Sequence, residues 1–371
     1  MDLARATLKN WDIFCRVLDN YGDIGVCWRL ASQLAAEHGA GVRLWVDDLA
    51  SCRMLVPELS MAPGPQQLHG VELRAWPEPW QPVEPGDVVV ESFACELPTA
   101  FVAAMARRAR PPVWINLEYL SAESWVEGAH GLPSPHPALP LRKHFFFPGF
   151  TPSTGGLLRE RGLLEARRRW DASRVGGAAL TIFLFSYGHP ALPALLEAWA
   201  GGPVPLRVRM PPGTARDQVG AWLGDPLRDG TEATRGALRV EALPFVAQED
   251  FDALLWEADL LLVRGEDSAV RAMWAGRPFV WQLYPQADDA RLHKMEAFLA
   301  RHGAGLPPPA REAEAELFRA WNFAGDPAAA WPRWLASRTE LAAHAERWCD
   351  ELENLGNLAE NLVNFCAERV K

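Results

Sequence analysis

The sequence has no long apolar run and no excess of basic charge, and these two absences exclude several classes of protein. None of its apolar stretches approaches the ~20 residues that a membrane-spanning helix needs, so we predict no membrane segment. Lys and Arg number 37 against 47 Asp and Glu, a formal net charge of −10. A nucleic-acid-binding protein would carry a basic stripe to displace counterions. We therefore predict no nucleic-acid partner, although a local group of donors could still bind a single nucleotide.

The six cysteines lack the spacing of a metal or redox site. They form no CxxC pair and no Cys–His pattern typical of zinc, so no zinc site is predicted. Two of them lie inside apolar runs and are predicted to be small buried residues. The first residues lack the apolar region of a secretion signal. These features predict a soluble, cytoplasmic protein, and we expect it to be a monomer.

The periodicity of the chain predicts an α/β fold. Strand-like segments at 11–18 and 42–46 flank a helix-like segment at 26–38, which together indicate a parallel βαβ unit. A second alternating series of strands and helices begins near residue 178.

Two domains follow from this pattern and from the length of 371 residues. We predict an N-terminal Rossmann-like domain over residues 1–170, joined by a C-terminal helix at about 355–371, and a second such domain over residues 171–354. A Pro-, Gly- and Phe-rich stretch at 131–155 is predicted to be a long loop. Because parallel sheets bind ligands outside the carboxyl ends of their strands, two such domains facing each other would bind a ligand in the cleft between them.

An acidic loop follows the first predicted strand. Asp19 and Asp23 flank a turn that Gly22 and Gly25 permit. Two carboxylates there could orient a hydroxyl or cationic nucleophile and take its proton. Alternatively, Asp23 could cap the helix that follows. The loop lacks the three-glycine dinucleotide fingerprint, so NAD binding is not predicted.

A second charged loop lies between an apolar strand and a predicted helix that begins at Ser268. Ser268 and Asp267 could cap this helix, whose first N–H groups suit a diphosphate. Arg264 could clamp a phosphate, and Glu266 could accept hydrogen bonds from ribose or sugar hydroxyls. The alternative is an ordinary capped helix with a surface ion pair.

Aromatic residues near the predicted strand ends also have two interpretations. Phe251 could stack on a nucleobase whose edge Gln248 binds, or it could be a core residue at the start of an amphipathic helix. Phe185 and Tyr187, at the end of another predicted strand, have the same two interpretations.

Taken together, these motifs resemble those of the elongation factor P arginine rhamnosyltransferases, which have the GT-B fold. The residues that carry the resemblance are Phe14–Val26, Phe146–Thr151 with Thr154–Glu160, Phe185–Tyr187 and Arg264–Ser268. The series from Phe245 to Pro278 is similar to the donor half of GT-B glycosyltransferases in general. The resemblance covers most of the chain, but residues 213–236 match nothing.

The resemblance implies a metal-independent, inverting transferase without a cofactor, which moves L-rhamnose from dTDP-β-L-rhamnose to one arginine of elongation factor P. Asp23 would be the general base, Asp19 a second essential acid beside the acceptor guanidinium, and Glu266 a further catalytic residue. On the residues alone, either aspartate could take the proton. The residues implied to bind the donor are Asn20, Tyr21, Gly22, Phe185, Tyr187, Gln248, Phe251, Arg264, Glu266, Asp267 and Ser268.

Two other functions compete with this one. A GT-B transferase with a lipid or saccharide acceptor predicts a basic, apolar patch on the first domain, and the sequence shows none. A nucleotide-sugar-binding module without catalysis predicts the loss of one or both loop acids, and both are present.

Overall fold

The computed structural model describes residues 8–19, 21–77, 79–173, 177, 179–285, 290–323 and 325–370. The chain forms two compact units: unit 1 comprises Met1–Arg161 and Leu352–Lys371, and unit 2 comprises Gly162–Glu351. Helix α6 (Leu163–Ser173) belongs to unit 2, so unit 1 ends before the boundary predicted at residue 170.

Unit 1 is built on an eight-stranded sheet of order β3-β4-β2-β1-β5-β6-β8-β7. Its central strands pair in parallel, whereas β3 and β7 pair antiparallel at the two edges. Every residue of β5 is buried, as expected for a parallel strand covered on both faces. The strands are β1 (Asn10–Cys15), β2 (Gly41–Val46), β3 (Gln66–Leu68), β4 (Val71–Ala75), β5 (Val88–Ser92), β6 (Val113–Leu117), β7 (Pro133–Pro135) and β8 (Arg142–Phe146).

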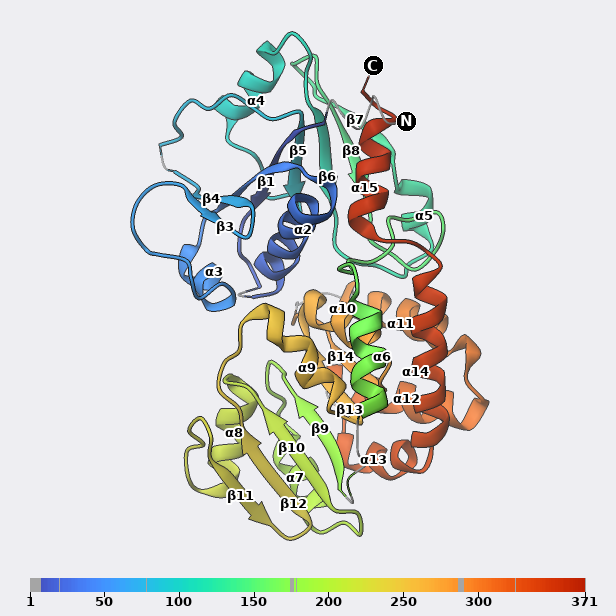
Figure 1. Cartoon of the computed structure of the whole chain (residues 1–371). Coiled ribbons are helices and arrows are strands. Elements are labelled where there is room, and N and C mark those ends of the chain that lie inside the picture. The colour runs from blue at the N-terminus through green and yellow to red at the C-terminus, as the bar shows by residue number, and fades with distance from the viewer. Residues whose placement is uncertain are drawn as a thin grey trace. The chain divides into compact units, whose positions relative to one another are not determined.

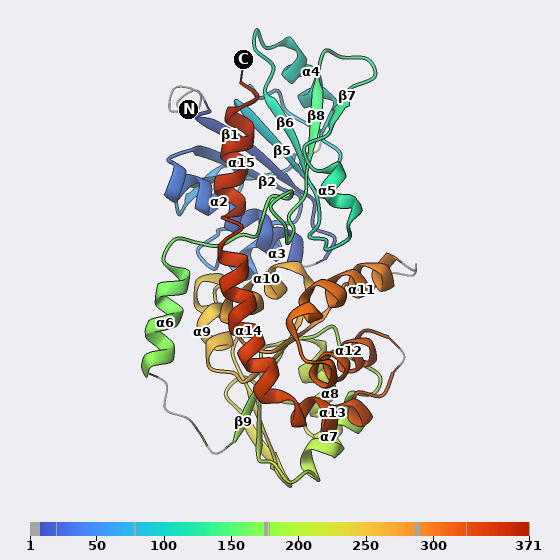
Figure 2. The same ribbon diagram turned by 90° about the vertical axis from the view of Figure 1, so that its right-hand side faces the viewer.

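Helices from both ends of the sequence cover this sheet. Helix α15 returns to unit 1 and packs beside α2 (Figure 1 and Figure 2). Leu358, Leu362 and Cys366 of α15 lie in the same buried core as Ile13 of β1 and Leu30 of α2. The helices are α2 (Gly22–His38), α3 (Leu49–Leu55), α4 (Thr99–Arg107), α5 (Trp125–Ala129) and α15 (Leu358–Ala367).

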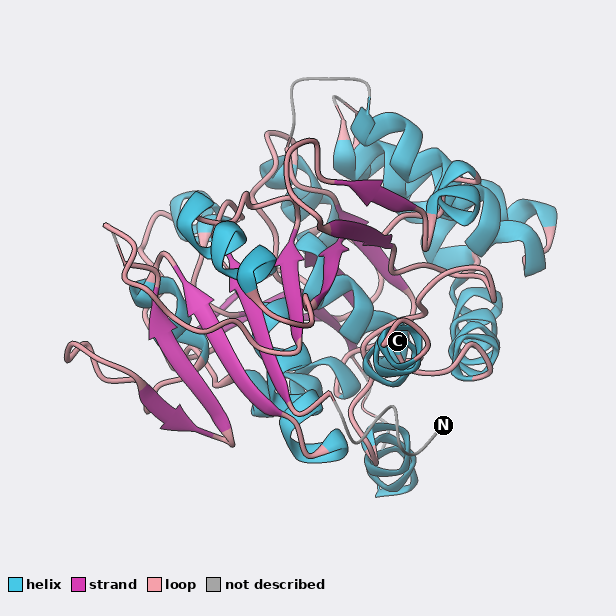
Figure 3. Ribbon diagram, turned by 90° about the horizontal axis from the view of Figure 1, so that it is seen from above, coloured by secondary structure: helices cyan, strands magenta, loops and turns pink. Residues whose placement is uncertain are grey.

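Unit 2 repeats the plan with a six-stranded sheet of order β11-β12-β10-β9-β13-β14, in which only the edge strand β11 is antiparallel among the strands described. Helices separate its parallel strands in the sequence, as βαβ crossovers require, and the same arrangement of helices beside strands is visible for unit 1 in the view from above (Figure 3). The strands are β9 (Leu180–Leu184), β10 (Leu206–Met210), β11 (Glu232–Arg235), β12 (Leu238–Ala242), β13 (Leu260–Arg264) and β14 (Phe279–Gln282).

The helices of unit 2 include four that follow its sheet in the sequence. They are α6, α7 (Leu192–Ala200), α8 (Thr214–Leu223), α9 (Phe251–Trp256), α10 (Gly265–Ala275), α11 (Ala290–His302), α12 (Pro308–Asn322), α13 (Pro327–Ala336) and α14 (Arg338–Glu353), with short 3-10 turns at Gln248–Asp250 and Gly303–Gly305.

One predicted loop is wrong in this structure. The stretch 131–155 contains the strands β7 and β8, which form an antiparallel pair at the edge of the unit 1 sheet. Pro133 and Pro135 hid the alternation of a strand, because proline in a sequence usually indicates the end of a strand. At the edge of a sheet, however, proline is tolerated. Residues 213–236, which matched nothing, form α8 and the edge strand β11.

All six cysteines are buried free thiols, which confirms the prediction for the two in apolar runs. Burial raises the pKa of Cys52 to about 12, so this thiol stays protonated and unreactive near neutral pH. In the part of the chain described here, no helix has both the length and the apolar character to cross a membrane.

Candidate active site

Several predicted site residues of each sheet follow strands at the point where the strand order reverses. In unit 1 the chain passes from β1 to β2 on one side and later to β5 on the other, and in unit 2 it passes from β9 to β10 and later to β13. The crevice outside the carboxyl ends of two such strands is the usual ligand site of an open parallel sheet. The acidic loop follows β1, while Phe185 follows β9 and Arg264 ends β13.

Asp23 is a buried acid of unit 1 that accepts three hydrogen bonds. It lies in the first turn of α2 and is 2% exposed. Its Oδ2 atom accepts N–H bonds from Leu18 (2.8 Å) and Asp19 (2.9 Å), and its Oδ1 atom accepts from the Tyr119 hydroxyl (3.2 Å). Three hydrogen bonds offset the cost of burying this carboxylate and fix its position beyond the carboxyl end of the central strand β1.

The alternative that Asp23 caps a helix is wrong. Helix α2 begins at Gly22, one turn before the predicted start at Val26, and Tyr21 occupies the N-cap position without a side-chain cap bond. At this early start, the Gly25 N–H donates a helical hydrogen bond to the Tyr21 carbonyl at 2.9 Å. Asp23 therefore sits inside the helix and binds the chain that leads into it.

Asp19 lies over the start of the same helix. It is largely buried, and its carbonyl accepts the Gly22 N–H at 2.6 Å. A Cβ atom at Gly22 would lie 2.5 Å from Asp19 Oδ2, so the missing side chain of Gly22 makes room for the Asp19 carboxylate. Tyr21 is half-buried beside them, and Asn20 lies outside the described residues.

Sequence reasoning missed Tyr119 as a member of this site. Its hydroxyl contacts Asp23, and it follows β6, which pairs with β5. The sequence could have indicated Tyr119 by its position just beyond the carboxyl end of the parallel strand β6. Glu118, the preceding residue, belongs to a separate polar group with Asn116, and burial is the main cause that raises its pKa.

In unit 2, Arg264 is brought together with two of the predicted aromatic residues. Its guanidinium carbon lies 4.6 Å from the ring centre of Phe185 and 4.6 Å from that of Tyr187, a cation–π arrangement. The Tyr187 loop is held because the Tyr187 N–H donates to Gln282 Oε1 (2.8 Å) and Gln282 Nε2 donates to the Gly188 carbonyl (3.0 Å).

Helix α10 starts earlier than the sequence suggested. It begins at Gly265 with Arg264 at the N-cap and no side-chain cap bond, so Asp267 and Ser268 lie inside the helix and do not cap it. The positive φ of Gly265 (68°) explains the abrupt change from strand to helix. Glu266 and Ser268 are half-buried in the first turns, where an α-helix directs N–H groups that have no partner within the helix.

A buried network supports Gln248 and Asp267. Gln248 Nε2 donates to Asp267 Oδ2 (3.1 Å), and Arg271 binds Asp267 (3.3 Å) and Asp252 (2.6 Å). Arg271 is 3% exposed. Sequence reasoning missed both Arg271 and Asp252, because a charged residue on a helix is usually solvated and nothing in the spacing marked these two as buried.

Phe251 packs as its core interpretation predicts, and its stacking on a nucleobase stays a prediction. Its ring packs edge-on against the buried Phe183 (5.6 Å between ring centres) and against Phe185 (6.0 Å), and it remains half-buried. It is thus part of the local core and also a neighbour of the ring that Arg264 covers.

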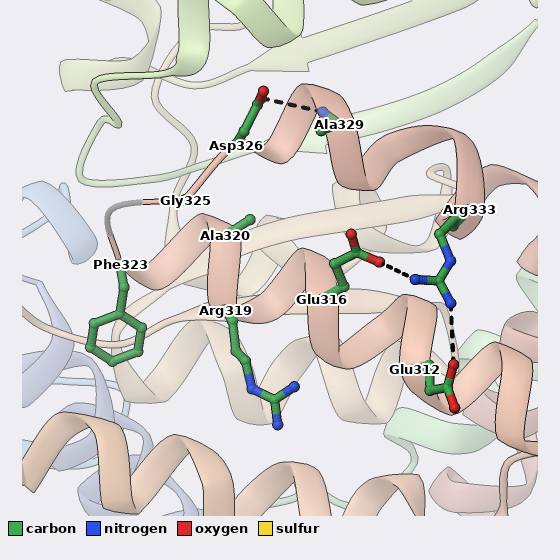
Figure 4. A pocket seen from close by; sticks show the side chains of 9 residues that line it. All are labelled: Glu312, Glu316, Arg319, Ala320, Phe323, Gly325, Asp326, Ala329 and Arg333. Carbon is green, nitrogen blue, oxygen red and sulfur yellow. Dashed lines mark hydrogen bonds and ion pairs between the residues drawn. The ribbon is translucent and has the colours of Figure 1, made fainter.

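Unit 2 also has a surface cavity elsewhere, between α12 and α13 (Figure 4). Both arginines that line it are paired: Arg333 with Glu312 and Glu316, and Arg319 with Glu296. Among the described residues that line this cavity, none was predicted to bind the donor.

The comparisons with known proteins agree on one family. Residues 11–367 match the family described as elongation factor P (EF-P) rhamnosyltransferase EarP. A protein-arginine rhamnosyltransferase of Pseudomonas putida is 50% identical over 370 residues, which cover 96% of this chain and 98% of the relative.

Solved structures agree as well. One that concerns EarP-mediated arginine glycosylation of translation elongation factor EF-P aligns with a TM-score of 0.66 at 37% identity, over 96% of this chain and 98% of that one. The calicheamicin glycosyltransferase CalG4 shares the fold alone, with a TM-score of 0.52 at 14% identity over 98% of this chain and 99% of its own. The predicted GT-B fold is confirmed, and the chain belongs to the EarP family of EF-P rhamnosyltransferases.

Proposed function

We propose that this chain is an inverting protein-arginine rhamnosyltransferase that moves L-rhamnose from dTDP-β-L-rhamnose to an arginine of elongation factor P. The observation that carries the proposal is the Asp23 carboxylate, buried and held by three donors at the strand-order reversal of unit 1. The 50% identity to a protein-arginine rhamnosyltransferase supports the sugar and the acceptor side chain. The likeness to the EarP structure supports elongation factor P as the acceptor protein.

In the proposed reaction, unit 1 acts on the acceptor. A guanidinium with a pKa above ~12 is a poor nucleophile while it is protonated. Asp23 takes one of its protons as the nitrogen bonds to the anomeric carbon, and dTDP leaves with the electron pair of the broken bond. Asp19 holds the planar group as a second carboxylate. Attack from the face opposite the leaving group inverts the anomeric centre.

Unit 2 acts on the donor. We propose that Phe185, Tyr187, Gln248 and Phe251 bind the thymidine, and that Arg264, Glu266, Asp267 and Ser268 bind the ribose and the diphosphate. The Arg264 charge and the N–H groups of the first turn of α10 stabilise the leaving dTDP, so the proposal includes neither a metal nor a cofactor.

Substituting Gly22 with alanine tests the placement of Asp19. The helical backbone accepts alanine, but its methyl group would lie 2.5 Å from Asp19 Oδ2 and would displace that carboxylate. We expect transfer to fall about tenfold or more, because displacements of ~1 Å near a reacting group are costly, while the melting temperature stays the same or rises. Unchanged transfer at saturating donor would show that the Asp19 position is not critical.

Substituting Arg264 with lysine tests the donor side. Lysine keeps the charge but loses the planar group that covers Phe185 and Tyr187. We expect the affinity for dTDP, measured by calorimetry, to fall about tenfold. Arg235→Lys is the matched control, since Arg235 covers the Trp222 ring at 4.5 Å in the same unit. Equal dTDP affinities for both variants would contradict the assignment of Arg264.

The function itself is tested by incubating the protein with dTDP-β-L-rhamnose and unmodified elongation factor P in the presence of EDTA. We expect elongation factor P to gain the mass of one deoxyhexose on one arginine, and a variant with that arginine replaced by lysine to gain none. Donor binding without any mass gain would indicate a nucleotide-sugar-binding protein and would overturn the proposal. Transfer only after a divalent metal is added would refute the metal-independent part.

A further inference from the structure

The hydrogen bonds of Asp23 distinguish its two oxygens. A carboxylate offers about four lone-pair directions, two on each oxygen. On Asp23, Oδ2 already accepts two backbone N–H bonds, from Leu18 and Asp19. Oδ1 accepts one bond, from the Tyr119 hydroxyl at 3.2 Å. Counting the donors among the described residues, the remaining acceptor direction therefore belongs to Oδ1, the oxygen that Tyr119 contacts.

The two backbone donors alone do not fix Oδ1. Both bind Oδ2, so they hold that atom while the carboxylate plane can still turn and carry Oδ1 with it. A donor on Oδ1 itself stops this motion. Asp23 lies on α2, whereas Tyr119 lies just after β6. This third hydrogen bond therefore connects the acid of the helix to the end of a strand.

The ring of Tyr119 is held in place by Phe93. The two rings stack with their centres 4.3 Å apart and 13° between their planes. Phe93 is 8% exposed and belongs to the unit 1 core, against which Tyr119 packs. The Phe93 N–H donates to the Leu117 carbonyl at 2.7 Å, which joins the segment after β5 to the end of β6.

This segment has an unusual backbone. Phe93, Ala94 and Glu96 have φ values of 57°, 52° and 54°, a left-handed region that residues with side chains rarely adopt. The Cys95 N–H donates to the Ser92 carbonyl, and the Glu96 N–H donates to Glu91 Oε1, both at 3.2 Å. Strained backbone of this kind is retained where surrounding contacts demand it, and here it places the Phe93 ring against Tyr119.

We infer that Tyr119 is a positioning residue that aims Asp23 Oδ1 at the acceptor, and that Phe93 holds the Tyr119 ring for this task. The inference rests on the proposed function, in which Asp23 takes a proton from arginine. According to this inference, Oδ1 is the atom of Asp23 that accepts the proton, and the hydrogen bond from the Tyr119 hydroxyl sets the orientation of Oδ1. The hydroxyl remains the donor to Oδ1 before transfer, and no covalent change occurs on Tyr119.

Tyr119→Phe removes the hydroxyl and keeps the ring that stacks on Phe93. We expect kcat for rhamnose transfer to elongation factor P to fall about tenfold at neutral pH, with the donor KM unchanged, because the lost bond acts on the chemical step. Rates are measured over a range of donor concentrations for both proteins, so that kcat and the donor KM are obtained separately.

Ala94→Gly serves as the control. Ala94 lies beside Phe93 in the same strained segment, but its side chain is exposed, so kcat and the donor KM should match those of the wild type. Equal kcat in Tyr119→Phe and the wild type would overturn the inference and leave the proposed function standing. A lower kcat together with a raised donor KM and a lower melting temperature would indicate a merely structural role and would also overturn it. Absence of transfer by the wild type would instead refute the proposed function.

Discussion

Replacing Asp23 with asparagine is expected to lower rhamnose transfer by about 10³-fold and to leave dTDP binding unchanged. General bases contribute roughly 10²–10⁴-fold, and the high basicity of the acceptor guanidinium makes loss of the base costly. Transfer is measured by the mass of elongation factor P, and dTDP binding is measured by calorimetry.

The structure explains why so small a change should have this effect. The N–H groups of Leu18 and Asp19 both face Oδ2, so the amide oxygen of the substituted side chain would take that place. The amide nitrogen would then replace Oδ1, and it offers only donors. Asp48→Asn is the matched control, because Asp48 caps α3 and asparagine caps a helix equally well. Transfer by Asp23→Asn within tenfold of that of Asp48→Asn would rule out Asp23 as the base.

Replacing Arg271 with methionine is expected to destabilise unit 2 by about 3–5 kcal/mol. The substitution leaves Asp252 and Asp267 without their shared partner, and removing one member of a buried ion-pair group costs about this much. Asp267 also accepts from Gln248, so the affinity for dTDP should fall as well. Urea unfolding and dTDP calorimetry measure the two effects.

Arg333→Met provides a control with the same chemistry at the surface. Arg333 also binds two acids, Glu312 at 3.2 Å and Glu316 at 2.7 Å, but its side chain is 55% exposed (Figure 4). Exposed ion pairs contribute about 0–1 kcal/mol, so this variant should unfold close to the wild type. If the two variants unfold at the same urea concentration, the buried Arg271 network does not stabilise unit 2 more than an exposed ion pair does.

The strand pattern and the acidic loop were readable from the sequence because they depend on local order. The strand predicted at 42–46 lies within β2 (Gly41–Val46), since its apolar residues alternate and glycines precede it. Asp19 and Asp23 could be predicted as site residues from their place after a buried strand. The family resemblance, and not the residue types, supplied the sugar and the acceptor.

Features that depend on distant partners could not be read in this way. The burial of Arg271 follows from Asp252, which lies on another helix, and the role of Tyr119 follows from a contact 96 residues away along the chain. The early starts of α2 and α10 were missed because glycine lowers helix propensity. At Gly22 and Gly265, tertiary contacts and the abrupt exit from a strand override that preference.

The return of α15 to unit 1 has a consequence for biosynthesis. Leu358, Leu362 and Cys366 complete the core beneath β1 and α2, yet they are translated after the whole of unit 2. A ribosome that has just finished Glu351 carries a contiguous unit 2 but an unfinished unit 1. Unit 1, which contains Asp19 and Asp23, is thus the first unit to be started and the last to be completed, so a chain released early would lack a finished unit 1.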